Sequence, residues 1–330
     1  MKILFRVDSN LKNGSGHLSR SFSLYKELIK YGHKIYFLML NYDKKFFYKK
    51  YKNFILYKGN YSQKKDFELT LKIIKKKKID TLILDNYFLG KNWSNEIRKR
   101  VNNFIILDDG LKKNYKCDLY VNSNYFLNKK KREDNKLLGL KYFILNQRYL
   151  KTKSSKIIYD IFINLGTGKF KLKLKKLLFY LNRLKKLKHI VVIGNYTNLI
   201  KDLSNKIDYK ISLVKSYKNL EDYIMKSKLC IGAAGTNLFE RLYLNKKNIV
   251  FSTAKHQIKI SNFLLKKKLI NYMGKIDNMN KKKILTIVNK NVSRILNHNN
   301  KTKLNIIFDG KGAKRIAIEI NKLNYKYKVN

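Results

Sequence analysis

The sequence predicts two α/β domains, each built on a doubly wound parallel sheet, and three observations lead to that prediction. The chain has 330 residues, more than one hydrophobic core usually serves, and domains of about 150 residues are common. Hydrophobic residues make up 44% of the sequence, which is enough for two buried cores despite the high charge. Short apolar runs alternate with longer segments of helical periodicity, and this alternation occurs in two successive sets.

The apolar runs are predicted to be strands buried on both faces, because most of them are apolar at successive positions. The first set covers residues 3–7, 34–40, 81–84, 104–107 and 119–121. The second set covers residues 160–164, 189–193, 210–214, 229–232 and 248–252. Helical segments lie between these runs, which is the order typical of parallel sheets.

The first helix and the linker set the limits of this pattern. Residues 18–31 have helical periodicity and stop at Gly32, the residue type most common just after a helix. The pattern lapses near Lys151-Thr-Lys-Ser-Ser-Lys156, which is polar. We therefore expect an N-terminal domain over residues 1–150 and a C-terminal domain over residues 151–330.

The net charge of +53 comes from 75 Lys and Arg residues against 22 Asp and Glu residues. Such an excess is typical of proteins that bind nucleic acids or anionic membranes. Only ten of these residues are arginine, however, and the lysines are spread along the whole chain. Since proline is absent and Lys, Asn, Ile and Tyr abound, we attribute the charge to genome composition and expect no specific nucleic-acid partner. The charge should still attract small anionic ligands.

Neither the cysteines nor the histidines have the spacing of a metal site, so no metal is expected. Cys117 and Cys230 lie far apart, and a disulfide is not expected in a reducing cytosol. The first residues are charged too early for a signal peptide, and no apolar run reaches the roughly 18 residues of a membrane span. The sequence therefore predicts a cytoplasmic protein without integral membrane association.

The segment between the first strand and the first helix is the first candidate ligand site. Gly14, Ser15 and Gly16 form a small-residue loop before the helix, whose free N–H groups favour an anion. A dinucleotide fingerprint would need a third glycine where Ser19 stands, so no redox cofactor is expected. His17 lies in the first helical turn, where a neutral imidazole can act as a base. Alternatively, it caps the loop through a backbone hydrogen bond.

Polar residues follow two later strands of the first set. Asp85 and Tyr87 lie where a strand ends, on the edge of the sheet where ligands bind in open α/β folds. Asp85 can orient His17, and Tyr87 can hydrogen-bond a sugar; alternatively, Asp85 caps the next helix. Asp108-Asp109-Gly110 ends another strand and is interpreted as a structural turn.

Two loops in the second half have the same strand–loop–helix form. Gly235, Thr236 and Asn237 offer donors to a diphosphate at a helix start, and Glu240 lies about one turn into that helix. A carboxylate there can accept hydrogen bonds from two ribose hydroxyls, although close packing of helix on strand also explains the small residues. A second loop, Asn164-Leu-Gly-Thr-Gly168, contributes Gly166 and Thr167.

The motifs of these segments together resemble a known family. They are Phe5-Arg-Val-Asp-Ser9, Gly14-Ser-Gly-His-Leu-Ser-Arg20, Asp85-Asn-Tyr87, Gly232-Ala-Ala-Gly-Thr-Asn-Leu-Phe-Glu-Arg241 and Asp309-Gly-Lys-Gly-Ala-Lys-Arg315. Their order is that of bacterial pseudaminic-acid pathway hydrolases, which the chain resembles from about residue 1 to 320. Those enzymes release UDP from UDP-2,4-diacetamido-2,4,6-trideoxy-β-L-altropyranose. The resemblance implies a GT-B fold, with two Rossmann-like domains facing a central cleft.

The resemblance also implies roles for individual residues. His17 would be the general base that activates water, and Tyr87 would lie in the substrate site with Arg20 nearby. Glu240 would hold the ribose, while the loops around Gly235 and Gly16 would hold the diphosphate. The implied reaction is an inverting displacement of UDP by water, which needs neither cofactor nor metal.

Two departures from the family pattern concern ligand-binding residues. The family usually has Gly-Gly-Ser/Thr-Asp in the loop where this chain has Gly166-Thr-Gly-Lys169, so an acidic residue is missing. The family commonly has Asn before Gln where this chain has His256 and Gln257. A histidine can replace an amide as a hydrogen-bond donor or mark a different sugar preference.

Two other functions remain open at this stage, and so does the oligomeric state. A UDP-sugar glycosyltransferase of the same fold would need an acceptor site, which the lysine-rich aromatic residues 42–51 can supply. A basic module for RNA or anionic surfaces would explain the charge but would leave the glycine loops and Glu240 without a role.

Overall fold

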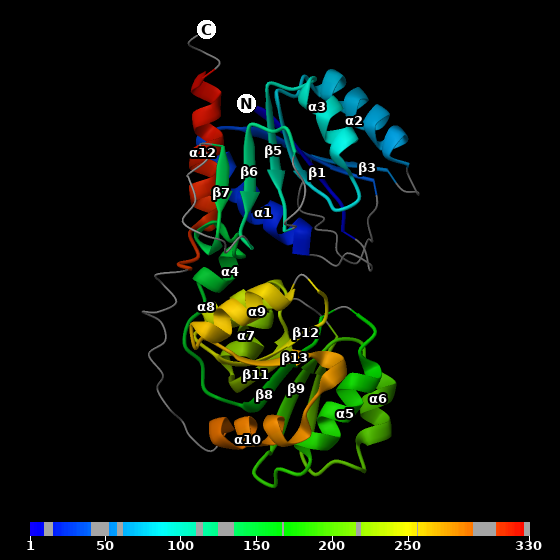
Figure 1. Ribbon diagram of the computed structural model, residues 1–330, viewed down its shortest axis with the longest axis vertical. Helices are drawn as coiled ribbons and strands as arrows, with labels where there is room; N and C mark the ends of the chain where they lie inside the picture. Colours follow the sequence, from blue (N-terminus) through cyan, green and yellow to red (C-terminus); the bar gives the residue numbers. More distant parts are fainter. Residues whose placement is uncertain are drawn as a thin grey trace. The chain divides into compact units, whose positions relative to one another are not determined.

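The computed structural model describes residues 1–9, 16–40, 53–57, 62–109, 115–124, 135–166, 168–215, 219–255, 257–292 and 308–326 (Figure 1). The chain divides into two compact units. The first comprises Met1–Asn146 and Phe308–Asn330, and the second comprises Gln147–Ile307. All ten predicted strands are present in parallel sheets, so the predicted fold class is confirmed. Among the described residues, no helix has both the length and the apolar character needed to cross a membrane.

The first unit contains a parallel sheet of seven strands in the order β3-β2-β1-β4-β5-β6-β7. The strands are β1 (Lys2–Val7), β2 (Lys34–Met39), β3 (Phe54–Leu56), β4 (Thr81–Asp85), β5 (Asn103–Leu107), β6 (Leu119–Asn122) and β7 (Lys136–Leu138). The chain runs outward from β1 to β3 and then returns to β4 on the other side of β1. The strand order therefore reverses between β1 and β4, and ligands of doubly wound folds bind beyond the carboxyl ends of such strands.

Helices cover both faces of this sheet because successive strand residues point to opposite sides. The helices are α1 (Gly16–Leu28), η1 (Ile29–Tyr31), α2 (Gln63–Lys77), α3 (Lys91–Arg98), η3 (Leu140–Tyr142) and α12 (Gly312–Lys326). Ile3 and Phe5 belong to the hydrophobic cluster that α1 and α12 cover. Leu4 and Leu82 belong to the opposite cluster, which α2 and α3 cover. Gly32 follows η1 with φ 73°, as its position after the first helix predicts.

The second unit contains a parallel sheet of six strands in the order β10-β9-β8-β11-β12-β13, and here the order reverses between β8 and β11. The strands are β8 (Tyr159–Asn164), β9 (His189–Ile193), β10 (Lys210–Val214), β11 (Ser227–Ala233), β12 (Lys247–Ser252) and β13 (Asn271–Lys275). The helices are α4 (Gln147–Leu150), α5 (Lys171–Leu181), α6 (Thr197–Leu203), α7 (Leu220–Met225), α8 (Thr236–Tyr243), α9 (Gln257–Lys266), η4 (Ile276–Asn278) and α10 (Lys281–Val292).

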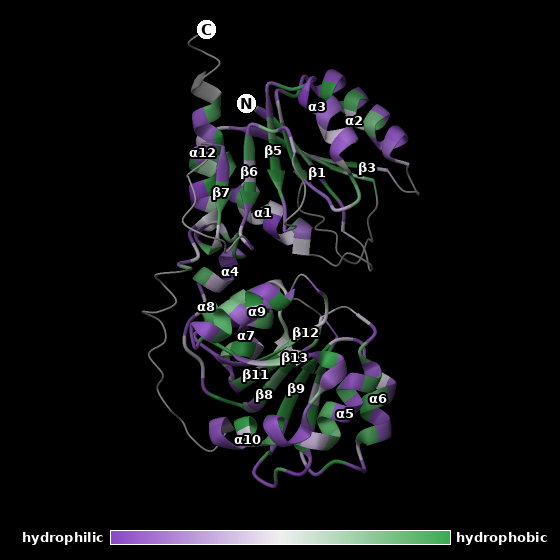
Figure 2. Cartoon of the chain, in the orientation of Figure 1, coloured by the Kyte–Doolittle hydropathy of each residue, from purple (hydrophilic) through white to green (hydrophobic). Residues whose placement is uncertain are grey.

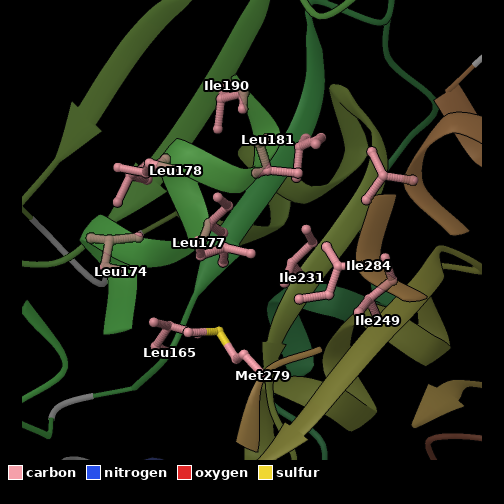
Figure 3. Packing of buried hydrophobic residues seen from close by; sticks show 14 of the residues in the cluster. Leu165, Leu174, Leu177, Leu178, Leu181, Ile190, Ile231, Ile249, Met279 and Ile284 are labelled. Atoms are coloured by element: carbon pink, nitrogen blue, oxygen red, sulfur yellow. The ribbon is translucent and has the colours of Figure 1, made fainter. Parts of the chain in front are cut away.

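The core of the second unit is built by one helix face against one sheet face. Leu174, Leu177 and Leu181 of α5 are fully buried and pack with Ile190 and Ile231 of the sheet (Figure 3). The hydropathy of the chain follows this layering, since the central strands are largely hydrophobic and the helices carry hydrophilic residues as well (Figure 2). The apolar runs of the sequence therefore form the sheet interior, and they leave the polar loops at its carboxyl edge.

The C-terminal segment does not follow the predicted domain limits of 1–150 and 151–330. Helix α12 belongs to the first unit, where Ile316 and Ile320 are fully buried in the cluster that includes α1 (Figure 1). A Cβ atom on Gly312 would stand 2.1 Å from the carbonyl oxygen of Phe143, so the start of α12 lies against the backbone. Chain order suggested the wrong unit because long-range packing, not sequence proximity, decides where a terminal helix lies.

Candidate functional site

His17 and Asp85 form a buried hydrogen-bonded pair at the point where the first sheet reverses its strand order. His17 is the second residue of α1, and Asp85 is the last residue of β4. Nδ1 of His17 lies 2.5 Å from Oδ1 of Asp85. Their side chains are 8% and 0% exposed. A carboxylate bound to Nδ1 holds the proton on that nitrogen and leaves Nε2 with its lone pair available as a base.

Arg20 links this pair to a second carboxylate. Its guanidinium donates to both oxygens of Asp85 at 2.5 and 2.7 Å, and to both oxygens of Asp109 at 2.7 and 2.8 Å. Burial by itself would raise the pKa of both carboxyl groups, but the charge of Arg20 keeps both pKa values below their ordinary range. Both acids therefore stay ionised at neutral pH, with one arginine shared between them.

Tyr87 completes the cluster on its exposed side. Its ring stands edge-on to the ring of His17, with centroids 4.4 Å apart and an interplanar angle of 83°. Its hydroxyl donates to Asp109 at 2.5 Å. Burial and the neighbouring charge of Asp109 raise the pKa of Tyr87, so the phenol stays protonated. The residue is 48% exposed, so part of its surface is accessible to a ligand.

Asp109 is a site residue that sequence reasoning missed, because Asp108-Asp109-Gly110 was interpreted as a structural turn. The structure places its carboxylate in contact with Arg20 and Tyr87, two of the predicted site residues. The available signal was its position just after β5, beside β4 in the same sheet. Acidic residues at the carboxyl ends of adjacent parallel strands lie at one edge of a sheet.

A second buried network holds the turn that carries Tyr87. Asn86 donates to Asp8 at 2.7 Å and accepts from the backbone N–H of Phe88 at 2.8 Å. Asp8 also accepts from Arg6, whose guanidinium is 1% exposed and binds Asp66 as well. Sequence reasoning did not single out Asp8 as a ligand-site residue, although it directly follows β1. Its contacts assign it a positioning role for the loop after β4.

In the second unit, the loop between β11 and α8 has the form expected of an anion site. Helix α8 begins after Gly235, and no side chain caps its first turn. Thr236 is exposed at this end. Gln257 lies nearby, since a Cβ atom on Gly235 would stand 3.9 Å from its Nε2. Gln257 accepts hydrogen bonds from the backbone and hydroxyl of Thr253, so it fixes the loop before α9.

Glu240 is buried beneath this loop with two hydrogen-bond donors. Tyr149 donates its hydroxyl at 2.9 Å and Asn237 donates its amide at 2.7 Å, both to Oε2 of Glu240. No described residue donates to Oε1. Burial raises the pKa of Glu240, although both hydrogen bonds oppose that shift. Tyr149 was not predicted, and its position 91 residues before Glu240 explains why no local pattern reveals the pair.

Two of the remaining predicted residues, Gly16 and Gly166, lie in the described part of the chain, and Gly16 is the first residue of α1. Gly166 lies after β8 with φ 87°, and its N–H donates to the side chain of Asn164 at 2.9 Å. Four predicted residues, namely Gly14, Ser15, Thr167 and His256, lie outside the described part of the chain. Among the described residues, no group of three or more His, Cys, Asp or Glu side chains could hold a metal ion.

No protein-family profile matches the chain. It is 28% identical over 272 residues to an uncharacterized protein of Methanocaldococcus jannaschii, MJ1062, and the match covers 74% of this chain and 54% of that protein. The chain thus spans about half the length of this curated relative.

Comparison with solved structures establishes the fold. MurG of Acinetobacter baumannii matches with a TM-score of 0.69 and 11% identity over 98% of this chain and 100% of that chain. The glycotransferase of kitacinnamycin matches with a TM-score of 0.72 and 11% identity over 98% and 99%. The UDP-GlcNAc 2-epimerase of Methanocaldococcus jannaschii, solved with UDP-GlcNAc and UDP, matches with a TM-score of 0.64 and 13% identity over 98% and 100%. The protein therefore has the GT-B fold.

Proposed function

We propose that this protein hydrolyses a UDP-activated sugar to the free sugar and UDP. The observation that supports this most directly is the pair formed by His17 and Asp85. Asp85 orients the imidazole through Nδ1, so Nε2 can accept a proton from water. For His17 we favour the role of a base over that of a loop cap, because its ring is fixed by a buried carboxylate and flanked by Tyr87.

The chemistry assigned to His17 is a single displacement at the anomeric carbon. As Nε2 removes a proton from water, the water oxygen forms a bond to that carbon and the bond from the carbon to the diphosphate oxygen breaks. UDP leaves as an anion, and the configuration at the carbon inverts. His17 then returns its proton to solvent, so the reaction consumes one water and needs no other reactant.

We assign nucleotide binding to the second unit. Its uncapped helix start after Gly235 is suited to a diphosphate, and Glu240 provides an oxygen for ribose hydroxyls. A similar structure supports this assignment, since the UDP-GlcNAc 2-epimerase of Methanocaldococcus jannaschii was solved in complex with UDP-GlcNAc and UDP. The motif resemblance supports 2,4-diacetamido-2,4,6-trideoxy-β-L-altropyranose as the proposed sugar and pseudaminic acid biosynthesis as the proposed pathway.

A glycosyltransferase is the second candidate, because a glycotransferase and MurG share the fold. It would carry out the same displacement with a sugar or lipid hydroxyl in place of water. The two functions differ in whether UDP is released when no acceptor is present.

The deciding experiment incubates the purified protein with a panel of UDP-sugars in ¹⁸O-enriched water and identifies the products by mass spectrometry. We expect UDP without label and a free sugar with one ¹⁸O at its anomeric carbon. Label on UDP would indicate attack at phosphorus and would contradict the role of His17. Release of UDP only after an acceptor is added would favour the transferase, and a UDP-sugar isomer as product would indicate an epimerase. The control is His17→Gln, which should bind UDP but release no sugar.

A further inference from the structure

Arg241 places a buried positive charge directly beneath the loop that begins α8. It is the residue after Glu240 and is 0% exposed. Its Nη2 donates to the carbonyl of Ala233 at 2.8 Å, and its Nε donates to the carbonyl of Asn237 at 3.2 Å. Side chains on a helix point toward its N-terminus, so the guanidinium of Arg241 is directed toward the start of its own helix.

This guanidinium forms no ion pair with a described carboxylate, although the more distant charge of Glu240 acts on it. Its Nη1 is buried and has no hydrogen-bond acceptor there, and no carboxylate lies within ion-pair distance. Glu240 is adjacent in sequence, but its Oε2 accepts from Tyr149 and Asn237 instead. Arg6 is also buried, but its charge is balanced by ion pairs with Asp8 and Asp66. Burial of an unpaired charge is unfavourable, so the exception at Arg241 calls for a ligand.

Gly232 leaves space for the guanidinium of Arg241 because it has no side chain. A Cβ atom on Gly232 would stand 2.8 Å from Nη1 of Arg241 and 2.3 Å from the carbonyl oxygen of Asn164. Gly232 and Asn164 are paired in the register of β11 and β8. The guanidinium therefore lies at the ends of the two strands between which the order reverses, where both of the predicted anion-binding loops begin.

The charge persists at neutral pH. Burial lowers the pKa of Arg241 to about 10, which is still well above neutrality. In an interior of low dielectric constant, such a charge acts more strongly on a nearby anion than it would in water. Its field adds to that of the helix N-terminus, which also favours an anion.

We propose that Arg241 is the positioning residue of a nucleoside-diphosphate site, and that its charge is balanced when the diphosphate binds at the start of α8. The assignment deepens the nucleotide-binding part of the proposed function and rests on it. Arg241 acts through the Ala233–Gly235 loop, whose carbonyl it holds, and through its field on the phosphates. It therefore sets the preference for a charged nucleotide over the neutral nucleoside.

The test compares UDP with uridine by isothermal titration calorimetry on the full chain. Arg241→Met should weaken UDP binding by about 10- to 100-fold, the range of one charged contact, and should leave uridine affinity within about threefold. Arg241→Lys keeps the charge and should retain most of the preference for UDP. Because each variant is measured with both ligands, a misfolded fraction changes the stoichiometry of both titrations and not the ratio of the two affinities. Arg241→Gln provides a second neutral variant if the methionine variant does not fold.

Lys246 offers a matched control at the opposite end of the same strand. Its Nζ donates to the carbonyls of Met225 and Ser227, and burial lowers the pKa of this lysine as it does that of Arg241. Ser227 begins β11, so this charge lies about 20 Å from the carboxyl end at a rise of about 3.3 Å per residue. Lys246→Met should lower the melting temperature but leave the ratio of UDP to uridine affinity unchanged.

Other outcomes would contradict the role of Arg241, the nucleotide site or the hydrolase proposal. If Arg241→Met weakens UDP and uridine equally, or if Lys246→Met changes the ratio as much, Arg241 has only a structural role. If the wild type binds neither UDP nor pyrophosphate, the nucleotide site and the role of Arg241 fail together. If the wild type binds UDP with the predicted dependence on Arg241 but hydrolyses no UDP-sugar, only the hydrolase proposal fails.

Discussion

Oδ1 of Asp85 lies 2.5 Å from Nδ1 of His17, and the same carboxylate accepts two hydrogen bonds from Arg20. Asp85 is thus shared between an imidazole and a permanent cation. Burial raises the pKa of Asp85, but the charge of Arg20 lowers it below its ordinary range, so the group stays a carboxylate. The carboxylate therefore remains a hydrogen-bond acceptor that orients the ring of His17 through Nδ1. Such an arrangement suits a base whose ring must be held in one orientation.

Replacement of Asp85 by asparagine tests this orienting role. Asp85→Asn keeps the shape of the side chain but lets the amide stabilise the wrong imidazole tautomer, so kcat should fall by about 10²- to 10⁴-fold. KM should change little, because the residue does not touch the nucleotide site assigned above. Steady-state release of UDP gives both parameters. Ser21→Ala removes only a 3.3 Å hydrogen bond to the same carboxylate and should lower kcat by about tenfold or less. Equal losses in the two variants would contradict the orienting role.

The ring and the hydroxyl of Tyr87 make different contacts and can be separated by mutation. Tyr87→Phe loses the hydrogen bond to Asp109 but keeps the edge-on contact with His17, so kcat should stay within about tenfold of the wild type. Tyr87→Ala loses both contacts and should lower kcat further, because the base is then less restrained. Stopped assays of free sugar provide the measurement. A phenylalanine variant as inactive as the alanine variant would instead assign the hydroxyl a direct role on the substrate.

Most of the fold could be predicted because buried parallel strands are apolar at successive positions. All ten predicted runs are strands in the structure, whereas β3, β7 and β13 were not predicted from the sequence. These three strands lie at sheet edges and have only three to five residues. In β13, Gly274 has φ 83°, and its sequence Asn-Tyr-Met-Gly-Lys lacks an apolar run. Edge strands need less burial, so composition marks them less clearly.

The candidate site could be predicted only where strand order brings residues together. Asp85 and His17 were paired in advance because each lies at the carboxyl end of the same predicted sheet. Asp109 was missed because its partner Arg20 is 89 residues away and the local sequence resembles a turn. That no described carboxylate forms an ion pair with Arg241 could not be predicted either, since ion pairing depends on packing in three dimensions.

Glu240 links nucleotide binding to stability through its burial. Burial raises the pKa of this group above its ordinary value of 4.5, so its protonated form is the one that folding favours. Its contribution to stability is therefore complete below pH 4.5 and is lost as the pH rises through the raised pKa. Glu240→Gln should match the wild type in melting temperature near pH 4. At pH 8 it should melt about 2–4 °C higher, the shift that about 1 kcal/mol produces in a domain of this size.

The same variant should bind UDP more weakly, by about tenfold, because an amide offers one acceptor oxygen where a carboxylate offers two. Melting curves at both pH values and a UDP titration at pH 8 provide the data. The two effects have opposite signs, so a general packing defect cannot produce both. A variant less stable than the wild type at pH 8, or one with unchanged UDP affinity, would contradict the assigned role of Glu240.

Gly312 decides whether the C-terminal helix can join the first unit. A Cβ atom at this position would stand 2.1 Å from the carbonyl oxygen of Phe143 and 2.7 Å from two backbone carbons, so neither neighbour can move as a flexible side chain would. Gly312→Ala should therefore lower the free energy of unfolding of the first unit by about 1–3 kcal/mol, the usual cost of overpacking. Lys314→Ala, at an exposed position of the same helix, should change it by about 0.5 kcal/mol or less. Chemical denaturation followed by circular dichroism measures both variants, and UDP affinity should be unaffected because the nucleotide site is assigned to the other unit. Equal stability of the two variants would mean that α12 does not depend on this close backbone contact.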